Sequence, residues 1–480
     1  MMMSYKDLIF SLKEHEILVS CDDLDISFNY LSYNSNDVKD GTLFVCKGNN
    51  FKKDYLVSAL ENGACCYVSE DDFGVSIPCI LVSDVRKALA ICSSIMYPDN
   101  LIKIGITGTK GKTTTNYFLH NILCNHLGYK PGIFATHYYY SGKSEGESHL
   151  TTPESLELHK YLNEMSKMNL KYVSMEVSSQ AEFHDRVYGM NFDIGAFLNI
   201  SPDHISLLEH KDFEDYFSCK LNFLKKCKKV VVYKHTDHYD DVINSCSSYI
   251  TFGFKDSDYV IKNISNDGRI SFELCSSSGS EVYEINMAGR FNVINASAAI
   301  VIAKEFGVSY DNICKGLLET SISGRMNVVF GRCPIIIDYA HNELSARALY
   351  ESLKDDYPGK RIKVVFGCPG DKGFNRRRDM GLLAGEYADY VYLTSEDPGH
   401  SKVSDICDDI IKYIKKYHSN YEVIEDRESA IRKAILESSS DDVLAILGKG
   451  DENYQMVDGK WVNYDTDIVI VNRELAKIKE

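Results

Sequence analysis

Residues 101–128 read LIKIGITGTKGKTTTNYFLHNILCNHLG, and this stretch decides the fold class. The apolar run LIKIGI predicts a buried strand, and TTTNYFLHNILCNHLG predicts a helix. The glycine-rich turn between them can direct backbone N–H groups toward a phosphate, where the helix dipole adds a positive field. A strand, a glycine-rich turn and a helix in this order predict a nucleotide-binding α/β domain.

The turn contains the side chains that phosphate binding requires. Lys112 would reach the β- and γ-phosphates of a nucleotide, and the Thr113 hydroxyl would bind Mg²⁺. The common phosphate-loop spacing is not met, because Ile106 stands where that pattern has its first glycine. A tight turn with a solvated lysine is the alternative interpretation. The predicted nucleotide contacts are Gly108, Thr109, Lys110, Gly111, Lys112, Thr113 and Thr114.

Strands and helices alternate on both sides of this unit. KYVSMEV, DIGAFLNI and VVVYK predict further strands before the helix NVINASAAIVIAKEFG, which indicates a parallel sheet covered on both faces. A second doubly wound pattern begins at PIIIDYA and continues through RIKVVFG, YVYLTS and VLAIL. The first residues carry short β-rich runs between helical stretches and predict a smaller α/β domain. Because single cores stop growing near ~250–300 residues, we expect three domains, 1–98, 99–328 and 329–480.

The composition excludes several classes of protein. Hydrophobic residues make up 44% of the chain and charged residues 25%, and no apolar run approaches the ~18 residues that span a bilayer. The first residues show no secretory signal, so we expect a cytoplasmic protein without a membrane partner. A formal charge of −16 opposes binding to nucleic acid but allows a local positive pocket for a small anion. The fifteen cysteines include no CxxC pair and indicate neither a zinc site nor a disulfide framework.

Eight motifs, in order, resemble those of the Mur ligases. TGTKGKTTT is followed by TTPES, MEVSSQ, FLNISPDH, GRFNVINASAA, GRM, DYAHN and GKGDENYQ. Two earlier runs, LSYNSNDVKDGTLFVCKG and FKKDYLVSALENGACCYVSE, look like the uridine-binding module of the family member that adds the third residue of the stem peptide. The resemblance covers nearly the whole chain. It implies an α/β uridine-binding domain, a central parallel-sheet ATPase domain and a C-terminal Rossmann-like domain that binds the amino acid.

The resemblance also implies a reaction. The γ-carboxylate of UDP-N-acetylmuramoyl-L-alanyl-D-glutamate would attack the γ-phosphate of ATP, and the α-amine of an amino acid would displace the resulting acyl phosphate. ATP and Mg²⁺ are the implied cofactors, the other partners are small molecules, and the expected oligomeric state is a monomer. The product would be a peptidoglycan precursor.

The implied catalytic residues are Lys112 and three groups that hold metal. Glu176 would bind Mg²⁺ together with Thr113, and His204 would bind a second ion. Lys220 stands where the family carries a lysine carbamylated by CO₂, which turns a cation into a carboxylate-like ligand. Apart from these motifs, His204 would be interpreted as a cap or a surface residue and Lys220 as a surface lysine.

Further residues are implied in binding ATP and the UDP-peptide. Asn292 and Asn295 lie three apart on one helix face, where their amides could read the adenine edge; helix capping is the alternative. Ser35 lies in an Asn-Ser-Asn sequence where the family has Asp-Ser-Arg, and a plain polar turn is as good an interpretation as a binding role. The other implied contacts are Arg325, Asp338 and His341, with Tyr339, for ATP, and Thr151, Thr152, Pro153, Ser178, Gln180 and Arg186 for the UDP-peptide.

The last domain bears on which amino acid is added. The diaminopimelate-adding member has Asp-Asn-Pro-Arg, whose arginine pairs with the distal carboxylate, where this chain has Glu396-Asp397-Pro398-Gly399. The missing arginine favours L-lysine, whose ε-ammonium Glu396 or Asp397 could hold. The following GHSKVSD differs from the acidic stretch of lysine-adding relatives, so ornithine or another diamine stays open. Gly448 and Glu452 would contact the α-amine end, and Lys372, Arg376 and Arg377 could hold the carboxylate, steer phosphate or form only a solvated basic run.

Two other functions stay open. A related ligase with another acceptor, such as a folate polyglutamate synthase, would share the phosphate loop but lack the uridine module. A paralogue that binds ATP or the UDP-peptide without ligation would have no reason to keep Lys112, Thr113, Glu176, His204 and Lys220 together.

Overall fold

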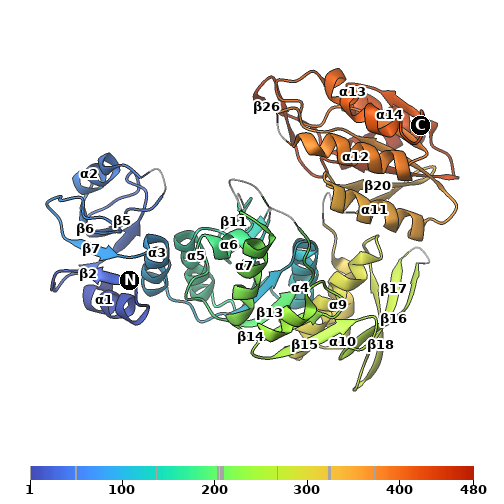
Figure 1. The fold of residues 1–480 in the computed structure, drawn as a ribbon. Helices are drawn as coiled ribbons and strands as arrows, with labels where there is room; N and C mark the ends of the chain where they lie inside the picture. Colours follow the sequence, from blue (N-terminus) through green and yellow to red (C-terminus); the bar gives the residue numbers. More distant parts are fainter. Residues whose placement is uncertain are drawn as a thin grey trace. The chain divides into compact units, whose positions relative to one another are not determined.

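The structure, a computed structural model, describes all residues except Met1, 49–50, His137, His149, 203–204, 206–209, 267–268, 323–325, Lys372 and Glu480. The chain divides into two compact units, Met1–Val260 with Ser297–Gly316, and Ile261–Ala296 with Leu317–Glu480. Figure 1 traces the elements of each unit in chain order. Within the described part of the chain, none of the helices combines the length and apolar character needed to cross a bilayer.

The first part of the chain forms a small α/β fold. Its sheet has the order β2-β7-β6-β5-β4, parallel except for β2. Asp84 caps the last helix by accepting the backbone N–H groups of Arg86 and Lys87. The elements are β1 Met3–Ser4, α1 Tyr5–Glu14, β2 Leu18–Ser20, β3 Ser27–Phe28, β4 Tyr30–Ser32, β5 Thr42–Val45, α2 Lys53–Glu61, β6 Ala64–Ser69, β7 Cys79–Val82 and α3 Val85–Met96.

The central sheet carries the predicted phosphate loop. Its parallel strands have the order β9-β12-β8-β13-β14-β15-β16, so that β8, which leads into the loop, lies between β12 and β13. The elements are β8 Ile102–Thr107, α4 Lys112–Leu127, β9 Gly132–Ala135, β10 Tyr138–Tyr140, β11 Glu145–Gly146, α5 Ser155–Lys167, β12 Tyr172–Glu176, α6 Ser179–Phe183, β13 Phe192–Phe197, α7 Phe213–Lys225, β14 Cys227–Tyr233, α8 Tyr239–Asn244, β15 Tyr249–Gly253, β16 Tyr259–Asn266, β17 Ile270–Ser276, β18 Gly279–Ile285, α9 Phe291–Glu305 and α10 Tyr310–Glu319.

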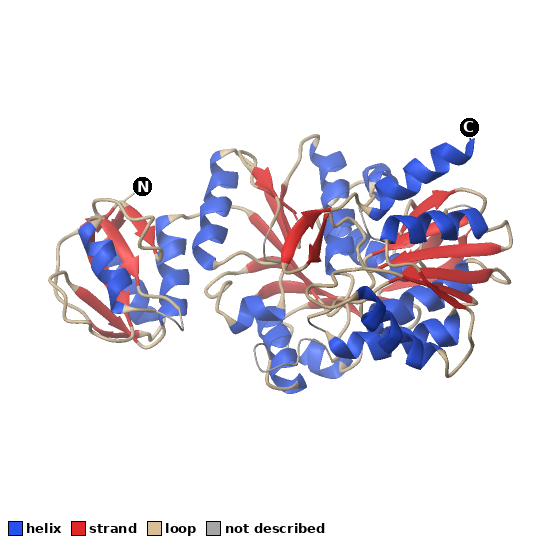
Figure 2. Cartoon of the chain, turned by 90° about the horizontal axis from the view of Figure 1, so that it is seen from above, coloured by secondary structure: helices blue, strands red, loops and turns tan. Residues whose placement is uncertain are grey.

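A second doubly wound sheet lies in the other unit, with the order β19-β20-β24-β21-β22-β23. All its strands are parallel except β19, and helices lie on both sides of it (Figure 2). The elements are β19 Asn327–Phe330, β20 Pro334–Asp338, α11 Glu343–Asp356, β21 Arg361–Phe366, α12 Phe374–Tyr387, β22 Tyr390–Leu393, α13 Val403–Ile414, β23 Tyr421–Val423, α14 Arg427–Glu437, β24 Asp442–Leu447, β25 Tyr454–Val457, β26 Lys460–Asn463 and α15 Asp467–Lys479.

The packing of β24 explains why its sequence is a continuous apolar run. Val443, Ala445 and Leu447 pack in a core with α11, α12 and α13, whereas Leu444 and Ile446 pack in a second core with α14 and α15. Successive side chains of a strand point to opposite faces, so a strand buried on both faces needs apolar residues at every position. The predicted α/β class, with a parallel central sheet and a Rossmann-like C-terminal sheet, is confirmed.

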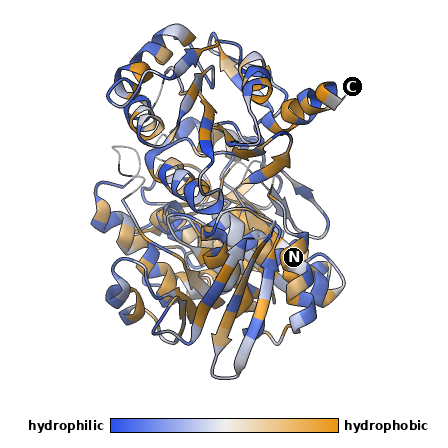
Figure 3. Cartoon of the chain, turned by 90° about the vertical axis from the view of Figure 1, so that its right-hand side faces the viewer, coloured by the Kyte–Doolittle hydropathy of each residue, from blue (hydrophilic) through white to orange (hydrophobic). Residues whose placement is uncertain are grey.

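The antiparallel additions to these sheets were not predicted. Pairs β9–β10, β10–β11, β17–β18, β19–β20 and β25–β26 are all antiparallel. Strand β17 mixes buried with half-buried residues and β18 mixes buried with exposed ones, and Figure 3 shows both hydrophilic and hydrophobic colours along them. Such half-polar strands lack the continuous apolar runs by which the buried strands were recognised. The predicted domain boundaries stay predictions; residue 98 lies between α3 and β8, and residue 328 lies in β19.

Candidate active site

The turn after β8 forms a loop shaped by two glycines and by the lysine that begins α4. Gly108 has φ 156° and Gly111 has φ 86°, and Gly111 is the N-cap of α4. Lys112 Nζ donates to the carbonyl oxygens of Gly108 (2.8 Å) and Thr109 (3.1 Å). The loop thus closes around its lysine at the N-terminus of a 16-residue helix, where the macrodipole attracts an anion.

Asn199, just beyond β13, holds the other side of the loop. Its Oδ1 accepts the backbone N–H of Lys110 (2.8 Å), its Nδ2 donates to the Lys110 carbonyl (3.0 Å), and its own carbonyl accepts the N–H of Thr109 (3.0 Å). The Thr109 hydroxyl lies 3.0 Å from that of Tyr216. The sequence analysis quoted the motif FLNISPDH but did not single out this asparagine, which it placed within the predicted strand DIGAFLNI, whereas β13 ends at Phe197.

Glu176, the last residue of β12, is fully buried beside the loop. Its carboxylate accepts the hydroxyls of Thr113 (3.0 Å) and Thr136 (2.9 Å) and the backbone N–H of Thr136 (2.8 Å). The Thr113 and Glu176 side chains, predicted to act together, are therefore in direct contact. Their oxygens form a compact donor set of the kind that Mg²⁺ prefers.

Lys220 of α7 reaches the same loop. Its side chain is buried, and Nζ donates to the Gly108 carbonyl (2.9 Å) and lies 4.8 Å from the centre of the Tyr216 ring. Lys112 and Lys220 therefore share one carbonyl acceptor. The surface position expected of an ordinary lysine does not describe Lys220.

The residues predicted for the UDP-peptide gather beside β12. Thr152 donates its hydroxyl to the Glu176 carbonyl (2.9 Å), and Ser178 caps α6 through the N–H of Ala181 (3.2 Å). The Thr152 and Ser178 hydroxyls lie 3.5 Å apart. Thr151 lies on the same side, with its hydroxyl 3.5 Å from that of Thr136. Half-buried Pro153 and Gln180 flank this group.

Arg186 extends this group with charge. It donates to Glu154 (2.8 Å) and to the Thr152 carbonyl (3.2 Å), and Lys47 pairs with the same Glu154. Burial raises the pKa of Glu154, but Lys47 and then Arg186 hold it below its ordinary value overall. Nearby, burial and then the charge of Arg86 lower the pKa of His184 to about 4. Two cations on one carboxylate leave net positive charge, which suits an anionic ligand.

Two hydrogen bonds of a buried histidine join α6 to α7, and the sequence analysis did not predict them. His210 is fully buried; its Nε2 lies 2.9 Å from the Ser179 hydroxyl and its Nδ1 2.9 Å from the Asp215 carboxylate. The contact with His210 holds the side chain of Ser179 in place, between Ser178 and Gln180, which are both predicted to contact the UDP-peptide. The run LEHKDFEDY gave no local sign of this role, because the serine lies 31 residues away.

The residues predicted for the adenine edge contact each other. Asn295 donates to the Asn292 amide oxygen (3.0 Å), and Asn292 donates to the Ala288 carbonyl (2.6 Å), just before α9. Asp338 accepts the N–H groups of Met326 (2.8 Å) and Ala340 (2.7 Å). These contacts position backbone around α9 and β20, and the roles in ATP binding stay predictions.

Three of the predicted residues, His204, Arg325 and Lys372, lie outside the described residues. Around Ser35, Asn34 Oδ1 accepts the N–H of Asn36 (3.0 Å), which is the geometry of a polar turn.

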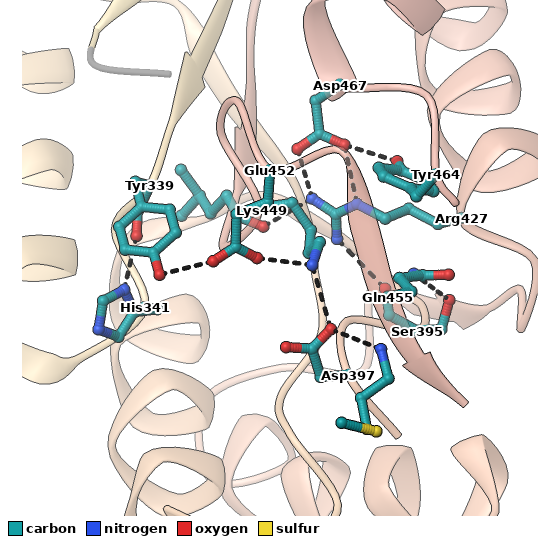
Figure 4. A network of polar contacts seen from close by, with 12 residues as sticks. Tyr339, His341, Ser395, Asp397, Arg427, Lys449, Glu452, Gln455, Tyr464 and Asp467 are labelled. Carbon is teal, nitrogen blue, oxygen red and sulfur yellow. Dashed lines mark hydrogen bonds and ion pairs between the residues drawn. The ribbon is translucent and has the colours of Figure 1, made fainter. Parts of the chain in front are cut away.

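A polar network lies at the carboxyl ends of β20, β22 and β24, where ligands bind in open α/β sheets (Figure 4). Lys449 Nζ pairs with Asp397 (3.1 Å) and Glu452 (2.6 Å). Glu452 also accepts the Tyr339 hydroxyl (2.8 Å), and Tyr339 packs edge-on against His341, with ring centres 4.7 Å apart. The structure therefore brings Asp397 and Glu452, both predicted for the amino acid, together through a lysine that was not predicted.

Glu396 is buried in the same region, and no hydrogen bond or ion pair joins its carboxylate to another described residue. Gly448 lies against it with φ 107°; a Cβ there would stand 2.8 Å from Glu396 Oε2. Burial raises the pKa of Glu396 to about 7, against the lowering effect of Arg427, Arg376 and Lys449. Unlike Asp397 and Glu452, Glu396 thus has no ion-pair partner among the described residues.

Two buried arginines organise the surrounding backbone. Arg427 makes a two-pronged pair with Asp467 (2.7 and 2.9 Å) and donates to the Leu447 carbonyl (2.9 Å) and, at 3.3 Å, to the Ser395 carbonyl. Arg377 donates to Asp409 (2.9 Å) and to the carbonyls of Pro369 and Gly370. Arg377 is therefore buried and does not belong to a solvated basic run, and its role in holding the carboxylate or steering phosphate stays a prediction.

The molecule is an α/β protein with a glycine-rich loop at the end of a strand in one sheet and a cluster of carboxylates at the strand ends of another. The family model of the Mur ligase middle domain matches residues 106–303, and that of the Mur ligase glutamate ligase domain matches residues 324–450. The chain belongs to the Mur ligase family.

Relatives match over nearly the full length. A UDP-N-acetylmuramyl-tripeptide synthetase of Lactobacillus delbrueckii subsp. bulgaricus is 37% identical over 100% of both chains. The UDP-N-acetylmuramoyl-L-alanyl-D-glutamate--L-lysine ligase of Streptococcus thermophilus is 39% identical, covering 94% of this chain and 93% of its own. A solved UDP-N-acetylmuramoyl-L-alanyl-D-glutamate--2,6-diaminopimelate ligase is 25% identical over 100% of both chains, with a TM-score of 0.73. Escherichia coli FolC shares only the fold, at 18% identity and a TM-score of 0.58 over 76% of this chain.

Proposed function

We propose that this protein is the ATP-dependent ligase that joins L-lysine to the D-glutamate γ-carboxylate of UDP-N-acetylmuramoyl-L-alanyl-D-glutamate. The observation that carries the proposal is the full-length similarity to ligases named for this reaction, at 37–39% identity. The setting is peptidoglycan precursor synthesis in the cytoplasm, by a monomer. Similarity to a diaminopimelate ligase is lower, at 25% identity.

ATP binds, in this proposal, with its phosphates on the loop between β8 and α4. The buried Glu176 carboxylate in contact with the Thr113 hydroxyl fits Mg²⁺, since both are hard oxygen donors beside the phosphate loop. The ion would neutralise phosphate charge and orient the γ-phosphate. Lys112 exchanges the carbonyls that it now contacts for phosphate oxygens, and Asn292, Asn295, Asp338 and His341 serve the nucleoside side.

The reaction then proceeds in two displacements. The γ-carboxylate oxygen of the dipeptide forms a bond to the γ-phosphorus, and ADP leaves. The unprotonated α-amine attacks the acyl phosphate carbon, phosphate leaves, and the nitrogen loses a proton as the amide forms. Lys112 balances negative charge on the phosphoryl group as it transfers, and the chain contributes chiefly by positioning. Arg186, Thr152 and Ser178 hold the UDP-peptide with its carboxylate toward the loop.

The pocket at the strand ends favours a cationic side chain over an anionic one. Glu396, Asp397 and Glu452 are acidic, and only Lys449 pairs directly with any of the three among the described residues. Gly399 stands at the position where the diaminopimelate-adding enzyme has arginine. The distal carboxylate of diaminopimelate would therefore face negative charge and would lack a bidentate arginine partner. L-Lysine carries a side-chain ammonium group without that carboxylate.

The test is ADP release by the purified protein with ATP, Mg²⁺ and the UDP-muramoyl dipeptide, in parallel with L-lysine, meso-diaminopimelate and L-ornithine. We expect turnover with L-lysine and loss of turnover on substituting Glu176→Gln. The exposed Glu351→Gln is the matched control. Turnover with diaminopimelate alone contradicts the specificity, and turnover with ornithine alone assigns the shorter diamine. No turnover with any amine favours a paralogue that binds without ligation.

A further inference from the structure

We infer that Lys449 is a positioning residue of the amino-acid pocket, whose buried ammonium group holds Asp397 and Glu452 in place for the incoming amino acid. The inference rests on the proposed function and names a residue that the motif comparison did not assign. Lys449 directly follows Gly448, at the end of β24.

The first argument is burial. The Lys449 side chain is completely inaccessible to solvent, and its Nζ lies 2.6 Å from Glu452 and 3.1 Å from Asp397. The Tyr454 ring covers it, with Nζ 5.2 Å from the ring centre. A lysine withdrawn from water persists only where partners compensate its charge. Here the compensation comes from two carboxylates of the pocket, so their positions and that of Nζ depend on one another.

The second argument is connectivity. Asp397 follows β22, Glu452 follows β24, and Tyr339, which donates to Glu452, follows β20. Asp397 also accepts the N–H of Met456 in β25 (3.2 Å), which links the hairpin β25–β26 to the same point. One ammonium group therefore ties together loops from three strand ends and a hairpin (Figure 4). Loops of this kind build the ligand site of an open α/β sheet.

The third argument is the contrast with Glu396. Lys449 contacts Asp397 and Glu452 but makes no ion pair with Glu396, whose carboxylate has no close partner among the described residues. Lys449 thus neutralises part of the acidic pocket and leaves one carboxylate for a cationic ligand. Without Lys449, Asp397 and Glu452 would repel each other in a buried site and move apart.

The experiment compares Lys449→Met, Lys449→Arg and the control Lys433→Met, which removes a lysine paired with Glu422 on the surface of the same unit. KM is measured for the amino acid that the wild-type chain uses, for ATP and for the UDP-dipeptide. A misfolded fraction lowers the active concentration and hence kcat, whereas KM does not depend on active concentration. The KM values therefore separate positioning from a loss of folded protein.

We expect Lys449→Met to raise KM for the amino acid by roughly 30-fold or more, as for the loss of one partner of a buried charge pair, with KM for ATP within about twofold of wild type. Lys449→Arg keeps the charge and should raise KM less, and Lys433→Met should not change it. Wild-type turnover combined with an unchanged amino-acid KM in Lys449→Met overturns this inference alone. Absence of wild-type turnover with all three amines contradicts the proposed function and the inference with it.

Discussion

Lys220 is the residue with the most specific chemical prediction. It is buried at the phosphate loop with Nζ 2.9 Å from the Gly108 carbonyl, a position from which a carbamate would place oxygen ligands near the phosphates. Lys220→Ala should abolish ADP formation, and short carboxylic acids should restore part of it by supplying the lost carboxylate. Lys225→Ala, an exposed position on the same helix, is the control. Full activity of Lys220→Ala without added acid would refute a metal-binding role.

Glu396 predicts a pH dependence of stability. Burial raises its pKa from 4.5 to about 7, so the folded protein binds this proton more tightly than the unfolded chain does. The stability that the proton contributes is complete below pH 4.5 and is lost as the pH rises toward 7, by at most roughly 3 kcal/mol. Glu396→Gln cannot titrate. The free energy of unfolding of this variant, relative to wild type, should therefore rise between pH 5 and pH 8 in urea titrations. A difference that does not change with pH would show that Glu396 is ionised in the folded protein throughout this range.

At the scale of the elements, a buried ion pair joins two helices to the sheet. Arg427 is the first residue of α14, and Asp467 is the first residue of α15. The Arg427 guanidinium also donates a hydrogen bond to the carbonyl of Leu447, the last residue of β24. Arg427→Met should lower the free energy of unfolding by about 3–5 kcal/mol, because Asp467 is left as an uncompensated buried charge. Adding Asp467→Asn should recover part of the loss. Urea unfolding followed by circular dichroism measures both; equal losses in the single and double variants would mean that charge is not the cause.

For the whole molecule, the division into two compact units predicts two unfolding transitions. The phosphate loop belongs to the unit that contains residues 1–260, and Arg427 belongs to the other. ADP with Mg²⁺, whose proposed contacts come from both units, should increase the free energy of unfolding by about 2.7 kcal/mol at a hundredfold excess over Kd. Arg427→Met should lower the transition temperature only of the unit that contains Arg427. Calorimetry tests this, and a single transition that both changes move would mean that the units unfold together.

The proposed reaction also requires the two units to cooperate. The acyl phosphate would form at the loop of one unit, while the amino acid binds at the strand ends of the other. Domain closure during each cycle is the usual solution for such enzymes.

Features that depend on neighbouring residues along the chain could be predicted from the sequence alone. LIKIGI and VLAIL were recognisable as strands because strands buried on both faces need apolar residues at every position. The phosphate loop was recognisable because its glycines, Lys112 and Thr113 lie within a few residues of one another. The antiparallel strands β17 and β18, in which polar residues are frequent, carried no comparable apolar run and were missed.

Contacts between segments that lie far apart in the sequence became visible only in the tertiary structure. Asn199 holds a loop 89 residues away, His210 holds Ser179, and Lys449 draws Asp397 and Glu452 together. The structure also shows that Asp397 pairs with Lys449 whereas Glu396 does not. The sequence left these two residues as equal candidates to hold the lysine ammonium. The physical reason is that burial and ion pairing depend on which strand ends meet at one edge of a sheet, and no local pattern of residues records that.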